Sequence, residues 1–204
     1  MAQLRRDPVS GRWIIIAAER AARPHDFAVP RGGHRGGFCP FCEGNEHCTP
    51  PEIAAVRPDG SPADGPGWRV RIVPNKYPAL QRKCPPGEGR SAFYQSVPGG
   101  GTHEVIIESP YHLVSPTEMA PRQFELVLRT CWERERALGG EDWLAYVLIF
   151  KNVGEAAGAS IEHTHSQLIG LPVMPKRVDE EMRSCRVFSS THRECFFCHM
   201  IERE

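Results

Sequence analysis

Residues 161–170 read IEHTHSQLIG, and this segment decides how the rest of the chain is interpreted. Successive side chains of a β-strand point to opposite faces, so a strand here places His163, His165 and Gln167 on one face. The alternate residues, Leu168 among them, take the other face. Three nitrogen-bearing polar side chains on one face of an apolar segment indicate a functional site.

The overall composition is that of an ordinary globular protein. The 204 residues are 40% hydrophobic and 25% charged, enough for one good core or for one domain and part of another. Lys and Arg together number 25, as do Asp and Glu, so no net charge favours nucleic acid or an anionic membrane. We find no apolar run of membrane-spanning length, and MAQLRRDPVSGRW lacks the apolar core of a signal peptide. We therefore expect a cytoplasmic protein with neither a nucleic-acid nor a membrane partner.

The cysteines point to a metal site. Four of the eight form two CxxC pairs, Cys39 with Cys42 and Cys195 with Cys198. In a reducing compartment such pairs bind metal more often than they form disulfides. Zinc prefers four tetrahedral thiolate and imidazole ligands, so the first pair predicts a zinc knuckle that needs two more ligands. The candidates from the residues alone are His112 and either histidine of the HTH segment, and the alternative is two reduced thiols in a loop.

The pattern of apolar residues predicts an α+β domain with a mostly antiparallel sheet and one packed long helix. We expect strands within 11–20, 68–74, 102–110, 143–152 and 163–171, a helix over 121–140, a second helix near 175–184, and a loop over 84–101. Residues 1–175 then form one domain. Residues 176–204 form a linker and the truncated start of a second lobe.

The chemistry of the HTH segment depends mainly on His165. A neutral imidazole is a good nucleophile toward phosphorus, and Gln167 on the same face can donate a hydrogen bond to a phosphate oxygen. The preceding segment VGEAAGAS, residues 153–160, is rich in small residues that let backbone N–H groups approach a phosphate. Two alternatives remain open at this point: a polar edge strand, or a metal site that uses both histidines.

Five segments, taken in order, resemble one known family. FKNVGEAAGASIEHTHSQ, residues 150–167, resembles the active-site segment of the galactose-1-phosphate uridylyltransferases of the histidine triad superfamily. The other segments that match are RRDPVSGRWIIIAAERAARP at 5–24, CPFC at 39–42, RIVPNKYPAL at 71–80 and ESPYH at 108–112. The resemblance implies a histidine-triad-like fold.

The resemblance also implies an activity. The first histidine of the pair, His163, would complete a zinc site with Cys39, Cys42 and His112. The second, His165, would attack the α-phosphorus of a nucleotide sugar and form a covalent nucleotidyl-histidine. The reaction implied is transfer of a nucleoside monophosphate from UDP-glucose to galactose 1-phosphate, in a protein that is dimeric in the full-length family.

The resemblance assigns substrate contacts as well. Gln167 would act with the nucleophile, and the Gly-x-Ser loop at Gly158 and Ser160 would hold phosphoryl oxygens. Ribose or phosphate contacts fall on Asn75 and Asn152, and phosphate contacts on Arg20 and Arg23. Four histidines match no motif and are expected to be solvated: His25, His34, His47 and His103.

One departure from the family pattern suggests a branch. The uridylyltransferases usually read His-Pro-His-Gly-Gln, whereas this chain reads HTHSQ. That version resembles the branch of ADP-glucose phosphorylase, which transfers adenylyl from ADP-glucose to phosphate and carries a second zinc in its C-terminal lobe. Cys195 and Cys198 fit the first half of that second site. A third reading is a non-catalytic, zinc-stabilised nucleotide-binding fragment. A zinc-finger nucleic-acid module is disfavoured, because no His pair follows the CxxC at finger spacing.

Overall fold

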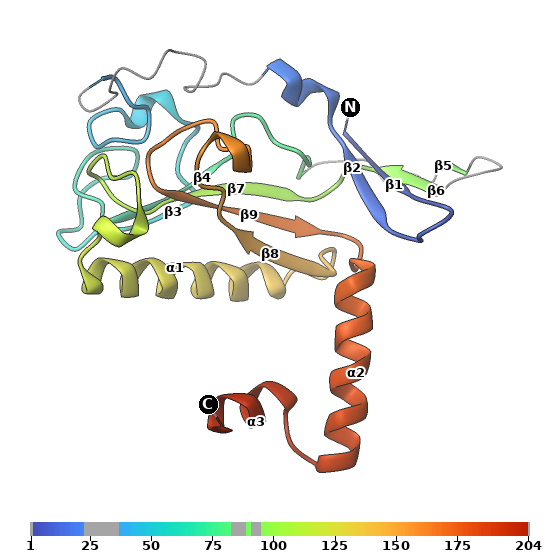
Figure 1. The fold of residues 1–204 in the computed structure, drawn as a ribbon. Helices are drawn as coiled ribbons and strands as arrows, with labels where there is room; N and C mark the ends of the chain where they lie inside the picture. Colours follow the sequence, from blue (N-terminus) through green and yellow to red (C-terminus); the bar gives the residue numbers. More distant parts are fainter. Residues whose placement is uncertain (1, 23–36, 83–88, 91–94, 204) are drawn as a thin grey trace.

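The computed structural model describes residues 2–22, 37–82, 89–90 and 95–203 (Figure 1). The strands are β1 (Gln3–Arg6), β2 (Trp13–Ile16), β3 (Ala54–Val56), β4 (Val70–Pro74), β5 (Gly89–Arg90), β6 (Gln95–Pro98), β7 (Thr102–Ile107), β8 (Tyr146–Phe150) and β9 (His165–Leu171). The α-helices are α1 (Pro121–Gly139), α2 (Lys176–His192) and α3 (Phe196–Arg203). Short 3-10 helices are η1 (Ala18–Ala22), η3 (Glu46–Cys48), η4 (Pro116–Glu118) and η5 (Glu155–Ala157).

A five-stranded antiparallel sheet in the order β3-β4-β7-β9-β8 forms the centre of the molecule. The central strand β7 is buried along its whole length, so both of its faces are covered. Strand β9 pairs with β7 in a register that sets Val105 opposite Gln167. The expected α+β class and antiparallel sheet are confirmed.

Helix α1 covers one face of this sheet (Figure 1). Val127 and Leu138 of the helix pack in a buried cluster with sheet residues such as Leu168. An ion pair of 2.6 Å between Arg134 and the buried Glu104 joins the helix to β7. The other face of the sheet carries the knuckle around Cys39 and the candidate site.

The sequence pattern of α1 predicts the helix but not the width of its buried face. Phe124 and Leu128 share the helical spacing of the apolar residues, yet they are 43% and 55% exposed. Val127 and Leu138 lie on the row that faces the sheet, and Cys131 packs partly buried against the same cluster. A single helix on a sheet buries only one narrow stripe, so an adjacent apolar row remains at the surface.

A second antiparallel sheet, in the order β2-β1-β6-β5, flanks the first. A small buried cluster formed by Leu4, Leu80 and Leu171 lies between the two sheets. The expectation of a loop over 84–101 is wrong at residues 89–90, where β5 pairs with β6, and at residues 95–98, which form β6 and pair with β1. Backbone pairing with a neighbouring strand creates this element, and a four-residue strand has too little side-chain pattern to predict it.

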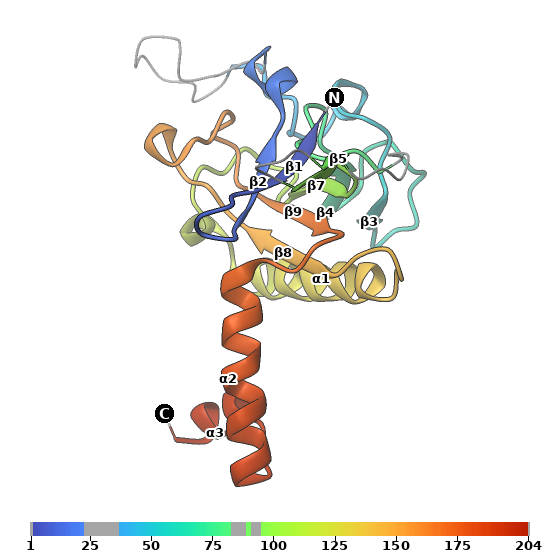
Figure 2. The same cartoon turned by 90° about the vertical axis from the view of Figure 1, so that its right-hand side faces the viewer.

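Helices α2 and α3 extend away from both sheets (Figures 1 and 2). No described residue of either helix is buried. Helix α2 begins at Lys176, beside the predicted boundary, and the division into a domain over 1–175 and a second unit over 176–204 stays a prediction. Within the described part of the chain, no helix combines the length and apolarity needed to cross a bilayer.

Candidate active site and metal centre

Four predicted ligands meet at one end of the central sheet. The ligand atoms of Cys39, Cys42, His112 and His163 all lie within 4.8 Å of one another. The two cysteines come from a tight turn in which the Cys42 N–H donates to the Cys39 carbonyl, 3.3 Å. His112 follows β7 and His163 immediately precedes β9. Segments far apart in the sequence thus bring together a donor set that can hold a metal ion.

The orientation of His163 suits a metal ligand. Its Nε2 lies 2.9 Å from the Ser109 carbonyl oxygen. A carbonyl only accepts, so Nε2 carries the proton and Nδ1 is the unprotonated nitrogen. That Nδ1 faces both sulfurs, 3.5 Å from Cys39 Sγ and 3.6 Å from Cys42 Sγ. A ligating histidine in a protein typically donates its other N–H to a carbonyl or carboxylate in this way.

Burial controls the protonation of this cluster. Burial lowers the pKa of His163 to about 4, so its imidazole is neutral at physiological pH. Burial also raises the pKa of Cys39 to about 12 and shifts that of Cys42 in the same direction. The thiols therefore hold their protons until a cation replaces them, as expected for metal-binding cysteines.

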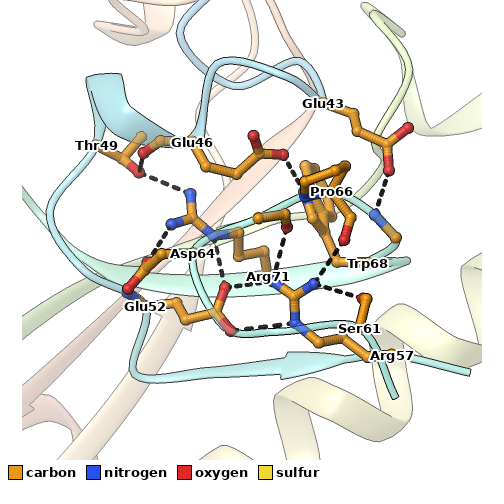
Figure 3. A network of polar contacts seen from close by, with 12 residues as sticks. Glu43, Glu46, Thr49, Glu52, Arg57, Ser61, Asp64, Pro66, Trp68 and Arg71 are labelled. Atoms are coloured by element: carbon orange, nitrogen blue, oxygen red, sulfur yellow. Dashed lines mark hydrogen bonds and ion pairs between the residues drawn. The ribbon is translucent and has the colours of Figure 1, made fainter. Parts of the chain in front are cut away.

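A polar network holds the knuckle against β4 (Figure 3). The indole Nε1 of Trp68 donates to Glu46 at 2.7 Å. The guanidinium of Arg71 is only 1% exposed and points between Thr49, Glu52 and Asp64 (Figure 3). Burial alone would raise the pKa of Glu46, but the hydrogen bonds from Trp68 and backbone N–H groups lower it overall. The carboxylate of Glu46 thus stays charged although it is buried.

A cavity of about 200 Å³ opens beside the cluster, on the sheet face opposite α1. Five predicted site residues line it, namely His165, Gln167, Asn75, Gly158 and Ser160. The remaining lining comes from the knuckle, the end of β4 and the residues after it, β7, and the loop before β9: Pro40, Phe41, Cys48, Thr49, Pro50, Val73, Pro74, Lys76, Tyr77, Val105, Ala159 and Ile161. Apolar walls with a few polar groups are typical of small-molecule sites.

His165 is held in one tautomer. Its Nδ1 lies 2.7 Å from the backbone carbonyl of His163, so Nδ1 carries the proton and donates to that oxygen. In the neutral ring, Nε2 is therefore the nitrogen that carries the lone pair. The Phe41 ring meets the imidazole edge to face at 5.2 Å between centroids. The ring of Phe41 also contacts His163 at 6.1 Å, so it joins the cluster to the cavity.

The other predicted residues are placed differently. Asn152 lines a smaller neighbouring cavity that also includes His165. Arg20 does not line the main cavity and instead donates to the Tyr77 carbonyl. Arg23 lies outside the described residues. Cys195 and Cys198 are exposed at the start of α3, so the second metal site stays a prediction.

Two buried groups near the site, His103 and Glu108, were not predicted from the sequence. His103, expected to be solvated, is only 5% exposed and contacts Gln167. The signal was available, because the alternation of residues 102–107 places position 103 on the face of Val105. The expectation holds for His47, which is exposed, whereas His25 and His34 lie outside the described residues.

A buried carboxylate supports the HTH segment from the α1 side. Glu108 is 3% exposed and accepts hydrogen bonds of 2.6 Å from Lys151, Thr164 and Ser166. Lys151 also donates to the backbone carbonyl of His165 at 2.9 Å. No local pattern connects these residues, because Glu108, Lys151 and the HTH segment are far apart in the sequence.

Comparison with known proteins agrees with this arrangement. The family profile described as galactose-1-phosphate uridyl transferase, N-terminal domain, matches residues 67–175, just over half of the chain. ADP-glucose phosphorylase of Arabidopsis thaliana is 34% identical over 204 residues, covering 96% of this chain and 56% of the relative. Galactose-1-phosphate uridylyltransferase of Thermotoga maritima is 26% identical over 205 residues, covering 100% of this chain and 57% of the relative.

A solved structure extends the comparison to three dimensions. The crystal structure of the Arabidopsis thaliana ADP-glucose phosphorylase with bound ADP-glucose superposes with a TM-score of 0.65 and 32% identity, covering 99% of this chain and 59% of the other. The chain thus spans about half the length of the curated relatives it matches. On the matched profile and the shared fold, the chain belongs to the galactose-1-phosphate uridyl transferase family, with its match in the family's N-terminal domain.

Proposed function

We propose that this chain is a nucleotidyltransferase that moves a nucleoside monophosphate from a nucleotide sugar to a phosphate-bearing acceptor through His165. The observation that carries the proposal is the tautomer of His165. Its Nδ1–H is held by the His163 carbonyl at 2.7 Å, which leaves Nε2 as a nucleophile in a ring that lines the cavity.

The proposed reaction has two displacement steps. In the first, Nε2 attacks the α-phosphorus, a P–N bond forms, and the bond from phosphorus to the bridging oxygen breaks. Sugar 1-phosphate leaves with that oxygen and its electron pair. In the second, a phosphate oxygen of the acceptor attacks the same phosphorus, and the P–N electron pair returns to Nε2. The hydrogen bond from Nδ1 to the carbonyl stabilises the positive charge that the ring gains in the intermediate.

Other residues of the cavity suit a phosphoryl group. Gln167 and Ser160 provide polar side chains and Lys76 provides a positive charge in the same lining. Gly158 has a backbone φ of 76°, a conformation that residues with a Cβ rarely adopt. We propose Asn75 and Asn152 as contacts of ribose or phosphate, while Arg20 and Arg23 stay predicted phosphate contacts.

We propose that zinc binds Cys39, Cys42, His112 and His163. With Zn–S and Zn–N bonds of ordinary length and tetrahedral angles, a sulfur and a nitrogen ligand lie about 3.6 Å apart. Three sulfur–nitrogen distances, Cys39–His163 at 3.5 Å and both Cys42–His112 and Cys42–His163 at 3.6 Å, fit that geometry. Zinc bound there supplies a structural cross-link between the knuckle and the strand that carries the nucleophile. A role for Cys195 and Cys198 in a second site belongs to the same proposal.

Two nucleotide sugars are candidates. The matched family profile, described as a galactose-1-phosphate uridyl transferase domain, supports uridylyl transfer with galactose 1-phosphate as acceptor, and the resemblance implies UDP-glucose as donor. The 34% identity to ADP-glucose phosphorylase supports the alternative, adenylyl transfer from ADP-glucose to phosphate. Both donors suit the proposed chemistry, because His165 attacks the same α-phosphorus in each. A homodimer and a cytoplasmic location are proposed from the resemblance and composition.

The intact mass of the zinc-loaded protein after incubation with UDP-glucose, and separately with ADP-glucose, tests the proposal. We expect a uridylyl or an adenylyl adduct in the wild type and none in His165→Ala. His192→Ala is the matched control, because His192 is exposed at the end of α2, a helix that extends away from both sheets (Figure 1).

Each outcome has a consequence. An adduct retained in His165→Ala would overturn the assignment of the nucleophile. The absence of any adduct in a folded, zinc-loaded wild type would overturn catalysis by this chain, and calorimetry with UMP and AMP would then test a nucleotide-binding fragment.

A further inference from the structure

We propose that His103 is a positioning residue that fixes the side-chain amide of Gln167, so that its NH2 group and not its oxygen is presented to the phosphoryl group. The inference rests on the proposed function and deepens it. It assigns a role to a buried histidine of β7 that belongs neither to the nucleophile nor to the metal cluster.

The tautomer of His103 follows from its backbone contact. The N–H of Ala79 donates to His103 Nδ1 at 2.9 Å. A backbone N–H can only donate, so Nδ1 is an acceptor and the ring proton resides on Nε2. The Nη1 of Arg20 lies 3.2 Å from the same Nδ1, and a second donor there, carrying a positive charge, also disfavours a proton on that nitrogen.

This tautomer determines which end of the Gln167 amide is engaged. His103 Nε2 lies 3.0 Å from Gln167 Oε1, and with the proton on Nε2 the contact is a hydrogen bond to the amide oxygen. Both side chains are buried, at 5% and 7% exposure, so an unsatisfied amide oxygen would be costly. The amide oxygen stays at His103, and the NH2 group remains for the cavity that Gln167 lines.

The neighbouring amide of Asn75 also approaches the His103 ring. Its oxygen accepts the Tyr77 N–H at 2.9 Å, which turns its Nδ2 toward His103. Nδ2 lies 3.2 Å from His103 Nε2. Both groups carry hydrogens, so this contact is not a hydrogen bond in the assigned tautomer. Asn75 lines the same cavity as Gln167, and two amide NH2 groups at one wall suit the negatively charged oxygens of a nucleotide.

Two substitutions separate the two nitrogens of the ring. The side-chain amide of asparagine reaches about as far as Nδ1, whereas that of glutamine reaches about as far as Nε2. His103→Asn can therefore accept from Ala79 but cannot donate to Gln167, and His103→Gln retains a donor at Gln167. We expect His103→Asn to lower the single-turnover rate of adduct formation about tenfold, the equivalent of one net hydrogen bond, and His103→Gln to restore most of it.

The rate is measured by intact mass at saturating UDP-glucose or ADP-glucose, whichever labels the wild type. If His103 acts through Gln167, adding His103→Asn to Gln167→Ala should change the rate less than about twofold. His192→Asn serves as the control for a His-to-Asn change. Additive losses in the double variant, an unchanged rate in His103→Asn, or an equal loss in His103→Gln would overturn the proposal.

A second measurement does not depend on activity. Long-range 1H–15N NMR of the histidine rings should show His103 with its proton on Nε2, and His103→Asn should shift the side-chain amide resonances of Gln167. A proton on Nδ1, or a charged ring, would overturn the proposal even if the wild type forms the adduct. A wild type without adduct but with the expected tautomer would contradict the proposed function while the positioning of Gln167 stands.

Discussion

Replacing Arg71 by methionine tests whether the buried network of Figure 3 stabilises the fold. Arg71→Met keeps an unbranched apolar stem of similar length but removes the guanidinium. Three hydrogen bonds disappear: 2.9 Å to Glu52, 2.7 Å to Thr49 and 2.8 Å to Asp64. The side chain is 1% exposed, so water cannot replace the lost contacts without entering the core.

The expected loss in the free energy of unfolding depends on the hydrogen bonds that Glu52 and Asp64 retain. Removing one member of a buried ion pair typically costs about 3–5 kcal/mol. Glu52 keeps two bonds from Arg57, at 2.7 and 3.2 Å. Asp64 is 46% exposed and still accepts the Glu52 N–H at 2.7 Å. Neither carboxylate is left unpaired in a dry environment. We therefore expect a loss near the lower end, about 3 kcal/mol in the free energy of unfolding.

Urea unfolding of the zinc-loaded protein at neutral pH, followed by tryptophan fluorescence, measures this loss. The matched control is Arg129→Met on α1, whose pairing with Glu125 joins side chains that are 62% and 69% exposed. Exposed helix pairs contribute about 0.3–0.5 kcal/mol, so the control should barely move the midpoint. A loss below about 1 kcal/mol in Arg71→Met, or one equal to that of the control, would refute the reasoning.

Three further predictions concern proton release on zinc binding, stability at acid pH and the ion pair that supports strand β9. Zinc added to the metal-free protein at neutral pH should release about two protons per site, because burial raises the pKa of the Cys39 thiol to about 12 and also raises that of Cys42. Calorimetry in buffers of different ionisation enthalpy measures the release. Zinc uptake without proton release would contradict the assignment of the two thiols as ligands. Burial tends to raise the pKa of Glu52, but hydrogen bonds from two arginines lower it below its usual 4.5. The contribution of Glu52 to stability is therefore complete above that pH and is lost as the pH falls through the folded-state pKa. Urea midpoints should decline on acidification below about pH 4.5, and a flat profile there would argue against this contribution. Lys151→Met should lower the free energy of unfolding by about 2–4 kcal/mol, because it leaves Glu108, 3% exposed, with only hydroxyl donors among the bonds described; a compensating gain on adding Glu108→Gln would confirm the cause by a double-mutant cycle.

The elements that the sequence predicts well are those whose side chains carry a strong period. Strands β4, β7, β8 and β9 and helix α1 lie within the predicted ranges, because each buries at least one face against another layer. The short strands β1, β3 and β6 were not predicted. Each has three or four residues, and backbone pairing across the sheet forms them, which leaves no side-chain period to read.

The residues of the site likewise fall into those predicted from local patterns and those that depend on contacts between distant segments. The HTH segment and the CxxC turn are local patterns, His112 was already a candidate ligand from the residues alone, and the resemblance supplied Asn75. The role proposed for His103 could not be read locally, because it depends on Gln167, 64 residues away in sequence. The same holds for Glu108, whose hydroxyl partner Ser166 is 58 residues away. Such contacts require the register of β7 against β9.

The register of β9 against its neighbours also limits which insertions and deletions the chain can accept. Strand β9 is held between β7, over six residue pairs, and β8, over five. Gain or loss of a single codon between His163 and Gln167 would exchange the two faces of part of the strand, so that His163, His165 and Gln167 would no longer share one face. The segment can accept substitutions but not single-codon insertions or deletions. An alignment of this chain with very distant sequences should therefore keep the His-x-His-x-Gln spacing without gaps.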